Sequence, residues 1–256
     1  MVAYLNGLKG LMKGTLHLVF PPQCMGCGET ISSDGALCPN CWRETDFISG
    51  LACTACGCPL PGEAPDPARA SQPDPVYCDD CLRQPRPWVG GRAAVVYSGV
   101  GRNLCLMLKH GDRLDLAPHL GDWLARAAAP LIVPGMIVTA VPIHLRRLFK
   151  RKYNQASQLS ARVARAHALP HHPDLLKRSR YSPPQDRRDA AARFANQADS
   201  ITLPSRHLAL LKDRPVLVID DVMSSGATLT AVTNCLIAAG AGPISVAVLA
   251  RAVKDT

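Results

Sequence analysis

The chain has 256 residues, of which 47% are hydrophobic and 19% are charged, so it can bury at least one sizeable core. This composition excludes a disordered tail and a fibrous protein. No apolar run reaches the roughly 20 residues that a membrane-spanning helix needs, so we expect no membrane insertion. Apolar residues recur at helical spacing in residues 1–22, where Lys9 and Lys13 interrupt them. We therefore expect an N-terminal helix there rather than a signal peptide.

Cysteine is concentrated before residue 82, where eight of the eleven cysteines form four CxxC pairs. Each pair places two thiolates on one tight turn, and two such turns complete the tetrahedral sulfur shell of a structural zinc ion. Ten residues separate the first two pairs and twenty-one separate the last two, spacings typical of zinc ribbons. We expect a double zinc ribbon over residues 23–85, with one Zn²⁺ held by Cys24, Cys27, Cys38 and Cys41 and the other by Cys53, Cys56, Cys78 and Cys81.

Two alternatives accompany this zinc assignment. A disulfide framework needs an oxidising compartment, whereas the absence of an export signal leads us to expect a cytoplasmic protein. Cys58 is left over two residues after Cys56, and it is either an unused thiol or an alternative zinc ligand.

The formal net charge of +9 is unevenly distributed along the chain. Residues 1–100 carry seven Lys or Arg and nine Asp or Glu, whereas residues 101–256 carry twenty-two and eleven. Thirteen of the basic side chains lie in residues 144–193, together with only three acidic ones. Such a run is either a solvated basic face or a surface for an anionic partner, such as phosphate, pyrophosphate or nucleic acid.

From about residue 90, apolar strands alternate with amphipathic helices. We expect strands over residues 92–97, 137–141, 216–219 and 244–249, and helices over residues 103–110, 116–129, 153–168 and 228–239. This alternation predicts an α/β domain over residues 90–256, with a mostly parallel sheet covered by helices on both faces. The polar, arginine-rich residues 174–200 are expected to form a mobile lid.

The most informative stretch is residues 216–229, in which a buried strand leads to Asp220 and Asp221 and then to a turn of small residues. Ligands of open α/β sheets bind beyond the carboxyl ends of the strands. A small-residue turn at a helix N-terminus bares N–H groups that bind phosphate, and Gly226 allows close approach. Two carboxylates beside a phosphate would repel it unless they faced sugar hydroxyls or Mg²⁺. The stretch therefore predicts a sugar-phosphate site.

This stretch resembles the signature of type I phosphoribosyltransferases, which bind 5-phosphoribosyl-1-pyrophosphate (PRPP). Nearly the whole sequence resembles the ComF/GntX family of competence-type proteins. The paired zinc ribbons carry that resemblance together with Leu108-Lys109-His110, Val141-Pro142-Ile143-His144, the Arg147-x3-Arg151-x-Tyr153-Asn154-Gln155 run, Gln185 and Arg193-x2-Asn196. The family usually has Gly at the position of Lys152.

The resemblance implies a type I phosphoribosyltransferase-like α/β domain preceded by a double zinc ribbon, with Mg²⁺ bound together with PRPP. It implies that Asp220 and Asp221 are the catalytic residues and bind the ribose hydroxyls. The 5′-phosphate is expected on the turn that comprises Ser224, Ser225, Gly226, Ala227 and Thr228. The pyrophosphate is expected beside Lys109, Pro142, Ile143, His144, Arg147 and Arg151.

Two functions follow from this resemblance. The first is transfer of a phosphoribosyl group to an unidentified nitrogenous acceptor, with release of pyrophosphate. The alternative is a non-catalytic protein that senses PRPP or a nucleotide and acts in DNA uptake or recombination through single-stranded DNA or partner proteins. Aromatic residues make up only 5% of the chain and are not expected to interleave with the arginines, so no base-stacking platform is expected.

Overall fold

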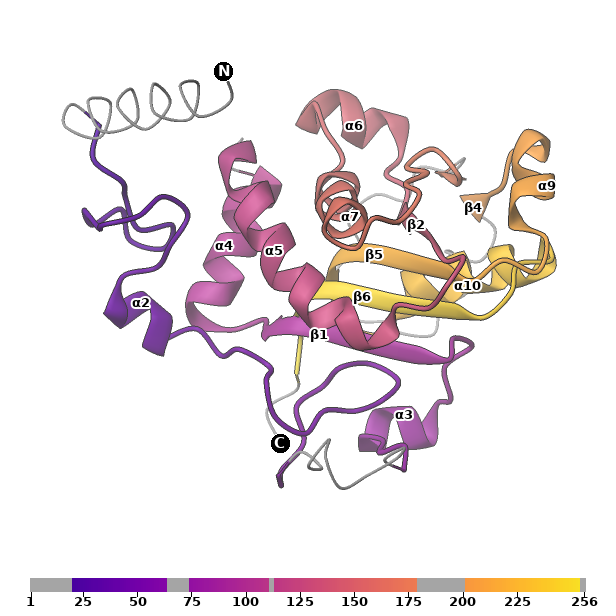
Figure 1. The fold of residues 1–256 in the computed structure, drawn as a ribbon, viewed down its shortest axis with the longest axis horizontal. Coiled ribbons are helices and arrows are strands. Elements are labelled where there is room, and N and C mark those ends of the chain that lie inside the picture. Colours follow the sequence, from indigo (N-terminus) through magenta and orange to yellow (C-terminus); the bar gives the residue numbers. More distant parts are fainter. Residues whose placement is uncertain (1–19, 64–73, 111–112, 179–200, 254–256) are drawn as a thin grey trace, which may run out of the picture. The chain divides into compact units, whose positions relative to one another are not determined.

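The computed structural model describes residues 20–63, 74–110, 113–178 and 201–253 (Figure 1). Contacts between residues divide the chain into two units, Met1–Thr45 and Asp46–Thr256. The first cysteine quartet therefore belongs to the first unit and the second quartet to the second unit. Residues 1–19, which hold most of the expected N-terminal helix, lie outside the described residues.

The described part of the first unit is a small zinc ribbon with little regular structure. Its first CxxC pair forms a turn that ends at Gly28, whose positive φ of 79° is readily adopted by glycine. Its second pair surrounds the start of α2 (Pro39–Arg43), where Cys38 is the N-cap and Pro39 occupies the first helical turn. So short a segment buries few apolar residues, so a bound metal must supply most of its stability.

The second unit is built on a four-stranded parallel sheet in the order β1-β6-β5-β2. Its strands are β1 (Gly90–Val96), β2 (Ile137–Ala140), β5 (Val216–Met223) and β6 (Ile244–Arg251). Every residue of β2 and β6 is buried, as expected for parallel strands covered on both faces. The sequence predicted all four strands, but β5 continues to Met223 because residues beyond Ile219 still pair with β6.

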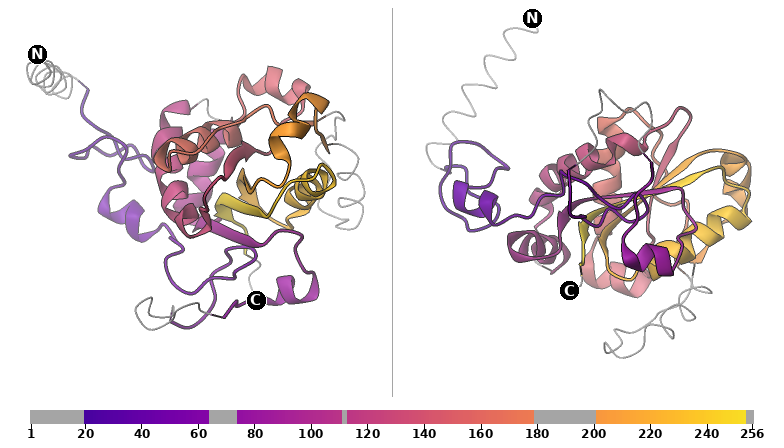
Figure 2. Two further views of the ribbon diagram at one scale, coloured as in Figure 1. Left: turned by 45° about the vertical axis from the view of Figure 1, so that its right-hand side comes forward. Right: turned by 90° about the horizontal axis from the view of Figure 1, so that it is seen from below.

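Helices cover both faces of this sheet. On one face lie α5 (Ala117–Ala128) and α7 (Gln155–Ala166), and α10 (Ala227–Ala238) packs against the other (Figures 1 and 2). These three helices and α4 (Gly99–His110) confirm the four predicted helices, with shifts at their ends of at most four residues. None of the helices in the described part of the chain is both long enough and apolar enough to cross a membrane.

Several short elements were not predicted from the sequence. They are α3 (Asp79–Arg83), α6 (Leu145–Arg151) and α9 (Leu208–Leu211), the 3-10 turns η1 (Leu114–Leu116), η2 (Ala129–Leu131) and η3 (Ser205–His207), and the antiparallel pair β3 (Lys177–Arg178) and β4 (Ile201–Thr202). Residues 179–200, which hold most of the expected lid, lie between β3 and β4 and outside the described residues.

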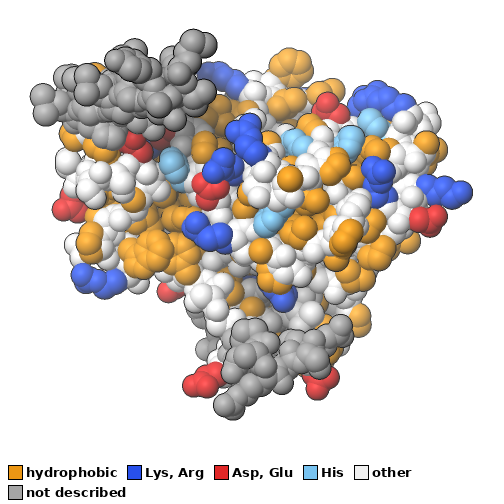
Figure 3. Space-filling view, in the orientation of Figure 1, with side chains coloured by type: hydrophobic (Ala, Val, Ile, Leu, Met, Phe, Trp, Pro, Cys, Tyr) orange, Lys and Arg blue, Asp and Glu red, His pale blue; other side chains and the backbone are white. Residues whose placement is uncertain are grey.

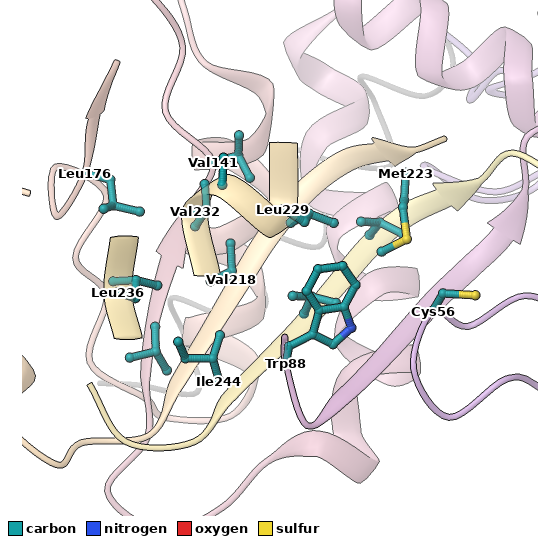
Figure 4. Packing of buried hydrophobic residues seen from close by; sticks show 14 of the residues in the cluster. Cys56, Trp88, Val141, Leu176, Val218, Met223, Leu229, Val232, Leu236 and Ile244 are labelled. Carbon is teal, nitrogen blue, oxygen red and sulfur yellow. The ribbon is translucent and has the colours of Figure 1, made fainter. Parts of the chain in front are cut away.

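The core beneath α10 also contains part of the second zinc ribbon. Val218 of β5 and Leu229 and Val232 of α10 pack in one cluster with Trp88, which is 4% exposed (Figure 4). Three ligand cysteines of the second quartet, Cys53, Cys56 and Cys81, belong to the same cluster. Burying one large aliphatic side chain contributes about 1.5–3 kcal/mol. The second ribbon is therefore an integral part of the α/β domain.

The second zinc ribbon also covers the outer edge of β1. Phe47 pairs antiparallel with Val95, so β1 has a backbone partner on the side away from β6. A Cβ at Gly91 would lie only 2.2 Å from the carbonyl oxygen of Ala55, and one at Gly57 only 2.5 Å from a backbone nitrogen of β1. The contact is thus between bare backbones, and it protects a sheet edge that could otherwise pair with another chain.

Candidate functional site

Each cysteine quartet has the geometry of a zinc site. Within each quartet the four Sγ atoms lie within 4.8 Å of one another. The Sγ atoms of Cys27 and Cys38 are 3.7 Å apart, and those of Cys56 and Cys78 are 3.6 Å apart. A tetrahedral shell with zinc–sulfur bonds of about 2.3 Å has sulfur–sulfur edges of about 3.8 Å, whereas a disulfide bond is about 2.05 Å long. Both quartets therefore fit a structural Zn²⁺.

Each quartet contains one thiol that ionises more easily than an ordinary cysteine, whereas burial raises the pKa of Cys41 and the hydrogen bond with Cys53 raises that of Cys56. A hydrogen bond from the Cys56 thiol, assisted by backbone N–H groups, lowers the pKa of Cys53 to about 4 against the opposing effect of burial. Burial also opposes ionisation of Cys24, but backbone N–H groups, that of Cys38 first, lower its pKa to about 6. Zinc binds the thiolate form. Cys58 stays outside the second quartet, which favours the unused thiol over the alternative ligand.

The C-terminal end of β5 carries the paired carboxylates. The side chain of Asp220 accepts a hydrogen bond from the backbone N–H of Asp221 at 2.9 Å, and that of Asp221 accepts one from Val222 at 2.8 Å. Lys109, near the end of α4, places its Nζ 3.6 Å from Oδ2 of Asp221. The Asp221 side chain is 15% exposed and that of Lys109 is 33% exposed. One carboxylate therefore has a cationic partner across the site.

Asp220 lacks such a partner among the ion pairs of the described chain. Burial, followed by the charge of Asp221, raises the pKa of Asp220 well above its ordinary value of 3.8. The N–H of Asp221 and the charge of Lys109 oppose this rise without cancelling it. The carboxylate form of Asp220 is thus destabilised by its protein surroundings. A ligand that offers it hydroxyl donors or a cation would relieve this cost.

The turn after β5 forms a first pocket. Gly226 is the N-cap of α10 and has φ 80° and ψ 2°, a left-handed conformation that glycine adopts without strain. The N–H groups of Ser224, Ser225 and Gly226 make no hydrogen bond within the described chain. The pocket is lined by Asp220 and residues 222–229. Free N–H groups and the N-terminal end of a helix dipole make it suited to an anion.

A second pocket adjoins the first, because Asp220, Val222 and Thr228 line both. It has a volume of about 180 Å³. The cationic side chains in its wall are Lys109, Arg151 and Arg178, and its other lining residues are Val141, Pro142, Ile143, Asn154, Gln155, Ala156 and Asp221. Three cations around one small space would attract an anion with several charges. The two carboxylates thus lie between an N–H-rich pocket and a cationic one.

Side chains at the start of α7 hold this second pocket together. Asn154 has the extended backbone of an N-cap, yet its side chain does not cap the helix. Its Nδ2 instead donates to the carbonyl oxygen of Val141 at 3.0 Å, which fixes the loop after β2. The side chain of Gln155 is 3% exposed and donates from Nε2 to the carbonyl oxygen of Lys109 at 3.2 Å. These two residues therefore act on the wall of the site as well as on the helix start.

Lys152 departs from the family pattern but keeps a glycine-like backbone. It terminates α6 with φ 65° and ψ −17°, and its N–H donates to the carbonyl oxygen of Leu148 at 2.6 Å. Glycine adopts this left-handed conformation freely, whereas a residue with a Cβ is strained there by roughly 1 kcal/mol. The turn before Asn154 thus has the shape that glycine would give it.

The structure brings together most, but not all, of the predicted site residues. Lys109, Pro142, Ile143 and Arg151 line the second pocket with both aspartates, and Ser224 to Thr228 line the first. His144 does not line either pocket, because its Nδ1 accepts the N–H of Arg146 at 3.1 Å and so caps α6. The side chain of Arg147 lies outside the described residues.

Among the lining residues of the second pocket that sequence reasoning missed, three have polar or charged side chains, Asn154, Gln155 and Arg178. The family run ending in Tyr-Asn-Gln could have indicated the first two. Arg178 carried no signal beyond its place in the basic run of residues 144–193.

Two family profiles match the sequence. A double zinc ribbon domain matches residues 15–87, and a phosphoribosyl transferase domain matches residues 156–256. Among curated proteins, the chain is 25% identical over 234 residues to the DNA utilization protein YhgH of Escherichia coli strain K12, with 89% of each chain covered. It is 25% identical over 253 residues to Competence protein F of Haemophilus influenzae, covering 94% of this chain and 95% of that one.

Solved structures with a similar fold are more distant. They include the allosteric regulatory enzyme of purine biosynthesis, at 17% identity and a TM-score of 0.38, and the glutamine PRPP amidotransferase of B. subtilis, at 16% identity and a TM-score of 0.39. In both cases the alignment covers 56% of this chain but only 30% of the other, so this chain spans less than a third of their length.

Proposed function

Because the chain belongs to the ComF family, in which a double zinc ribbon precedes a phosphoribosyltransferase domain, we propose that it binds PRPP and transfers its phosphoribosyl group to a nitrogenous acceptor. The observation that carries this proposal is the pair of adjoining pockets on either side of Asp220 and Asp221. One pocket offers N–H groups to a monophosphate, and the other offers cations to a diphosphate.

The charge pattern supports one direction for bound PRPP. The 5′-phosphate accepts hydrogen bonds from the N–H groups of the turn after β5. The ribose hydroxyls donate to Asp220 and Asp221, which removes the penalty on the Asp220 carboxylate. The diphosphate lies beside Lys109, Arg151 and Arg178. Mg²⁺ bound with the ligand would neutralise diphosphate charge, and the carboxylates of Asp220 and Asp221 are oxygen ligands of the kind that would hold it.

The proposed reaction breaks the bond between ribose C1 and the diphosphate oxygen. That bonding electron pair leaves with the diphosphate, while the lone pair of the acceptor nitrogen forms the new bond to C1 and the nitrogen loses its proton. Positive charge develops on the sugar ring in glycosyl transfers of this kind. The protein contributes by orienting the ribose on two carboxylates and by stabilising the departing charge with Lys109, Arg151 and Arg178.

Calorimetric titration with PRPP and Mg²⁺ tests the binding step. We expect the variant with both Asp220→Asn and Asp221→Asn to lose binding while it retains two zinc ions per chain. A matched control is Asp115→Asn, because Asp115 pairs with Arg113 on the surface at 2.7 Å, and it should bind as the parent does. Unchanged PRPP affinity in the double variant would rule out this site.

Release of pyrophosphate tests the transfer step. Incubating the protein with PRPP and a mixture of nitrogenous metabolites should release pyrophosphate only when the acceptor is present. PRPP binding without pyrophosphate release for any acceptor would favour the non-catalytic alternative, in which the pockets sense PRPP. Binding of zinc by eight cysteine thiols requires reducing conditions, so a cytoplasmic location is part of this proposal.

One observation favours a second candidate function, contact with single-stranded DNA. The expectation that aromatic residues do not interleave with the arginines was wrong, because Phe149 lies inside the basic run on α6 and is 84% exposed. An exposed ring among cations can stack on a base. On the face shown in Figure 3, the described Lys and Arg side chains are nevertheless scattered among apolar and neutral ones rather than gathered into a groove.

Fluorescence anisotropy with a single-stranded oligonucleotide over a salt series tests this second candidate. Phe149→Ala should weaken binding, by about 1–3 kcal/mol if the ring stacks on a base. Tyr77→Ala, at a tyrosine that is 43% exposed, is the control. Equal loss in both variants, or affinity that does not fall with salt, would remove DNA contact at α6 as a function.

A further inference from the structure

The turn that lines the first pocket is held from behind by two arginines. Nη1 of Arg86 donates to the carbonyl oxygen of Ser225 at 2.8 Å. Nη1 of Arg251 donates to the carbonyl oxygen of Ser224 at 2.9 Å and to that of Met223 at 3.3 Å. Three consecutive carbonyl groups therefore point to one side of the turn, toward guanidinium groups.

This arrangement determines where the N–H groups of the turn point. In a trans peptide the C=O and the following N–H point in opposite directions, and the described chain contains no cis peptide. Holding the carbonyls of Met223, Ser224 and Ser225 on one side therefore directs the N–H groups of Ser224, Ser225 and Gly226 to the other side. None of these three N–H groups has a partner among the described residues, and the three residues line the first pocket.

Both arginines also lie against the second zinc ribbon. Arg86 follows α3, interacts with the Cys81 thiol and lies with its Cζ 5.8 Å from the ring centroid of Trp88. Arg251 ends β6, is 3% exposed and interacts with the Cys56 thiol. Cys56 and Cys81 belong to the same quartet. Each guanidinium group thus lies near enough to a ligand cysteine to influence its ionisation, and it also donates to a carbonyl of the turn.

The close fit leaves the turn little freedom. A Cβ at Gly226 would lie 3.0 Å from Nη1 of Arg86, so the guanidinium packs directly on the turn. Neither arginine is among the residues that line the two pockets. Their effect on a bound anion would therefore act through the backbone of the turn.

We propose that Arg86 and Arg251 are positioning residues, which couple the second zinc ribbon to the phosphate turn by holding its carbonyls so that its N–H groups face the 5′-phosphate. This inference rests on the proposed function. It assigns the second zinc ribbon a role in ligand affinity beyond stabilising the fold. Arg86 is the better residue to test, because Arg251 is deeply buried and its loss would disturb the core.

The test compares Arg86→Ala with Arg86→Lys and with the matched control Arg83→Ala. Arg83 lies on α3 of the same ribbon, and its side chain is 76% exposed. Calorimetry with ribose 5-phosphate and, separately, with magnesium pyrophosphate distinguishes the two pockets. We expect Arg86→Ala to weaken ribose 5-phosphate binding by about 10- to 100-fold, the usual cost of losing one hydrogen bond from an N–H group of the turn to a charged phosphate. Pyrophosphate binding should be unchanged. Arg86→Lys should be intermediate, and Arg83→Ala should match the parent.

Three results would overturn the inference. They are unchanged ribose 5-phosphate affinity in Arg86→Ala, equal loss for both ligands, and loss of zinc from that variant. If the parent binds neither ligand, the proposed function fails, and backbone dynamics then decide the inference alone. The ¹⁵N heteronuclear NOE at Ser225 and Gly226 should fall in Arg86→Ala but not in Arg83→Ala, and equal values in both variants would refute the coupling.

Discussion

Replacing Asp220 by Asn should stabilise the unliganded protein while removing its ligand. As a general scale, two like unit charges about 4 Å apart repel by about 4 kcal/mol at an effective dielectric of about 20. Lys109 compensates part of this repulsion through its contact with Asp221, and Asp220 keeps some access to solvent. After a discount for that screening, we expect Asp220→Asn to raise the free energy of unfolding by about 1 kcal/mol near neutral pH. For a chain of this size that is about 2–4 °C in the melting temperature.

The pH dependence gives the sign of this effect. Because the folded protein raises the pKa of Asp220 above its ordinary value of 3.8, the parent is most stable, relative to the Asn variant, below that value. This relative stability is lost as the pH rises through the folded pKa. The advantage of Asp220→Asn should therefore be present at pH 8 and should not shrink between pH 5.5 and 8.5, a range chosen to keep zinc bound.

Thermal denaturation of zinc-loaded protein, followed by circular dichroism across this pH range, measures the difference. Asp115→Asn provides a control of opposite sign, because a hydrogen bond from Arg113 lowers the pKa of Asp115 and its removal should slightly destabilise the protein at pH 8. A lower melting temperature for Asp220→Asn than for the parent at pH 8 would refute the view that the protein surroundings destabilise this carboxylate.

The remaining predictions concern strain, zinc and charge. Lys152→Gly should raise the melting temperature, because it removes roughly 1 kcal/mol of backbone strain at the left-handed conformation of Lys152. Lys177→Gly in β3 is the control and should lower the melting temperature, so equal shifts in the two variants would show that Lys152 is not strained. Native mass spectrometry should show two zinc ions in the parent and one in either Cys27→Ser or Cys53→Ser, and only Cys53→Ser should also weaken ribose 5-phosphate binding in calorimetry. Lys109→Met should weaken magnesium pyrophosphate binding by at least tenfold and ribose 5-phosphate binding much less, and equal losses would contradict its place in the second pocket.

The elements that the sequence predicts best are those with a strong local pattern. The buried strands and the four long helices of the α/β domain are apolar with a clear period, and the carboxylate pair ends one of those strands. The end of β5 was placed too early, because Asp220 and Asp221 look like loop residues although Asp220, Val222 and Met223 pair with β6. The polar side chains of a functional site predict a loop here, although the backbone continues as a paired strand.

The short elements escaped prediction for a different reason. α6 spans only seven residues, and its apolar residues are Leu145, Leu148 and Phe149, the first and last of which are exposed, so the segment is too short for an amphipathic period to identify it as a helix. The second role of Asn154 was equally hidden, because a helix-starting asparagine looks the same whether it caps the helix or bonds a distant carbonyl.

Contacts between distant parts of the chain left no local trace at all. Arg86 and Ser225 are 139 residues apart in sequence, and no composition or spacing rule joins an arginine of a zinc ribbon to a carbonyl of a phosphate turn. The integration of the second ribbon into the α/β core is of the same kind, since it depends on how Trp88 and the cysteines pack in three dimensions.

The strand order of the sheet has a consequence for how the chain folds during synthesis. β1 is the first strand to leave the ribosome, but its strand neighbour in the four-stranded sheet is β6, the last. At about 5–20 residues per second, some 10–30 s separate the synthesis of the two strands. The four-stranded sheet cannot be completed until β6 has been synthesised. Before then, β1 can pair only on its outer edge, where Phe47 is the partner of Val95. A ribosome that stalls before residue 244 releases a chain whose β1 and β5 both expose open edges, a form that chaperones and proteases would recognise.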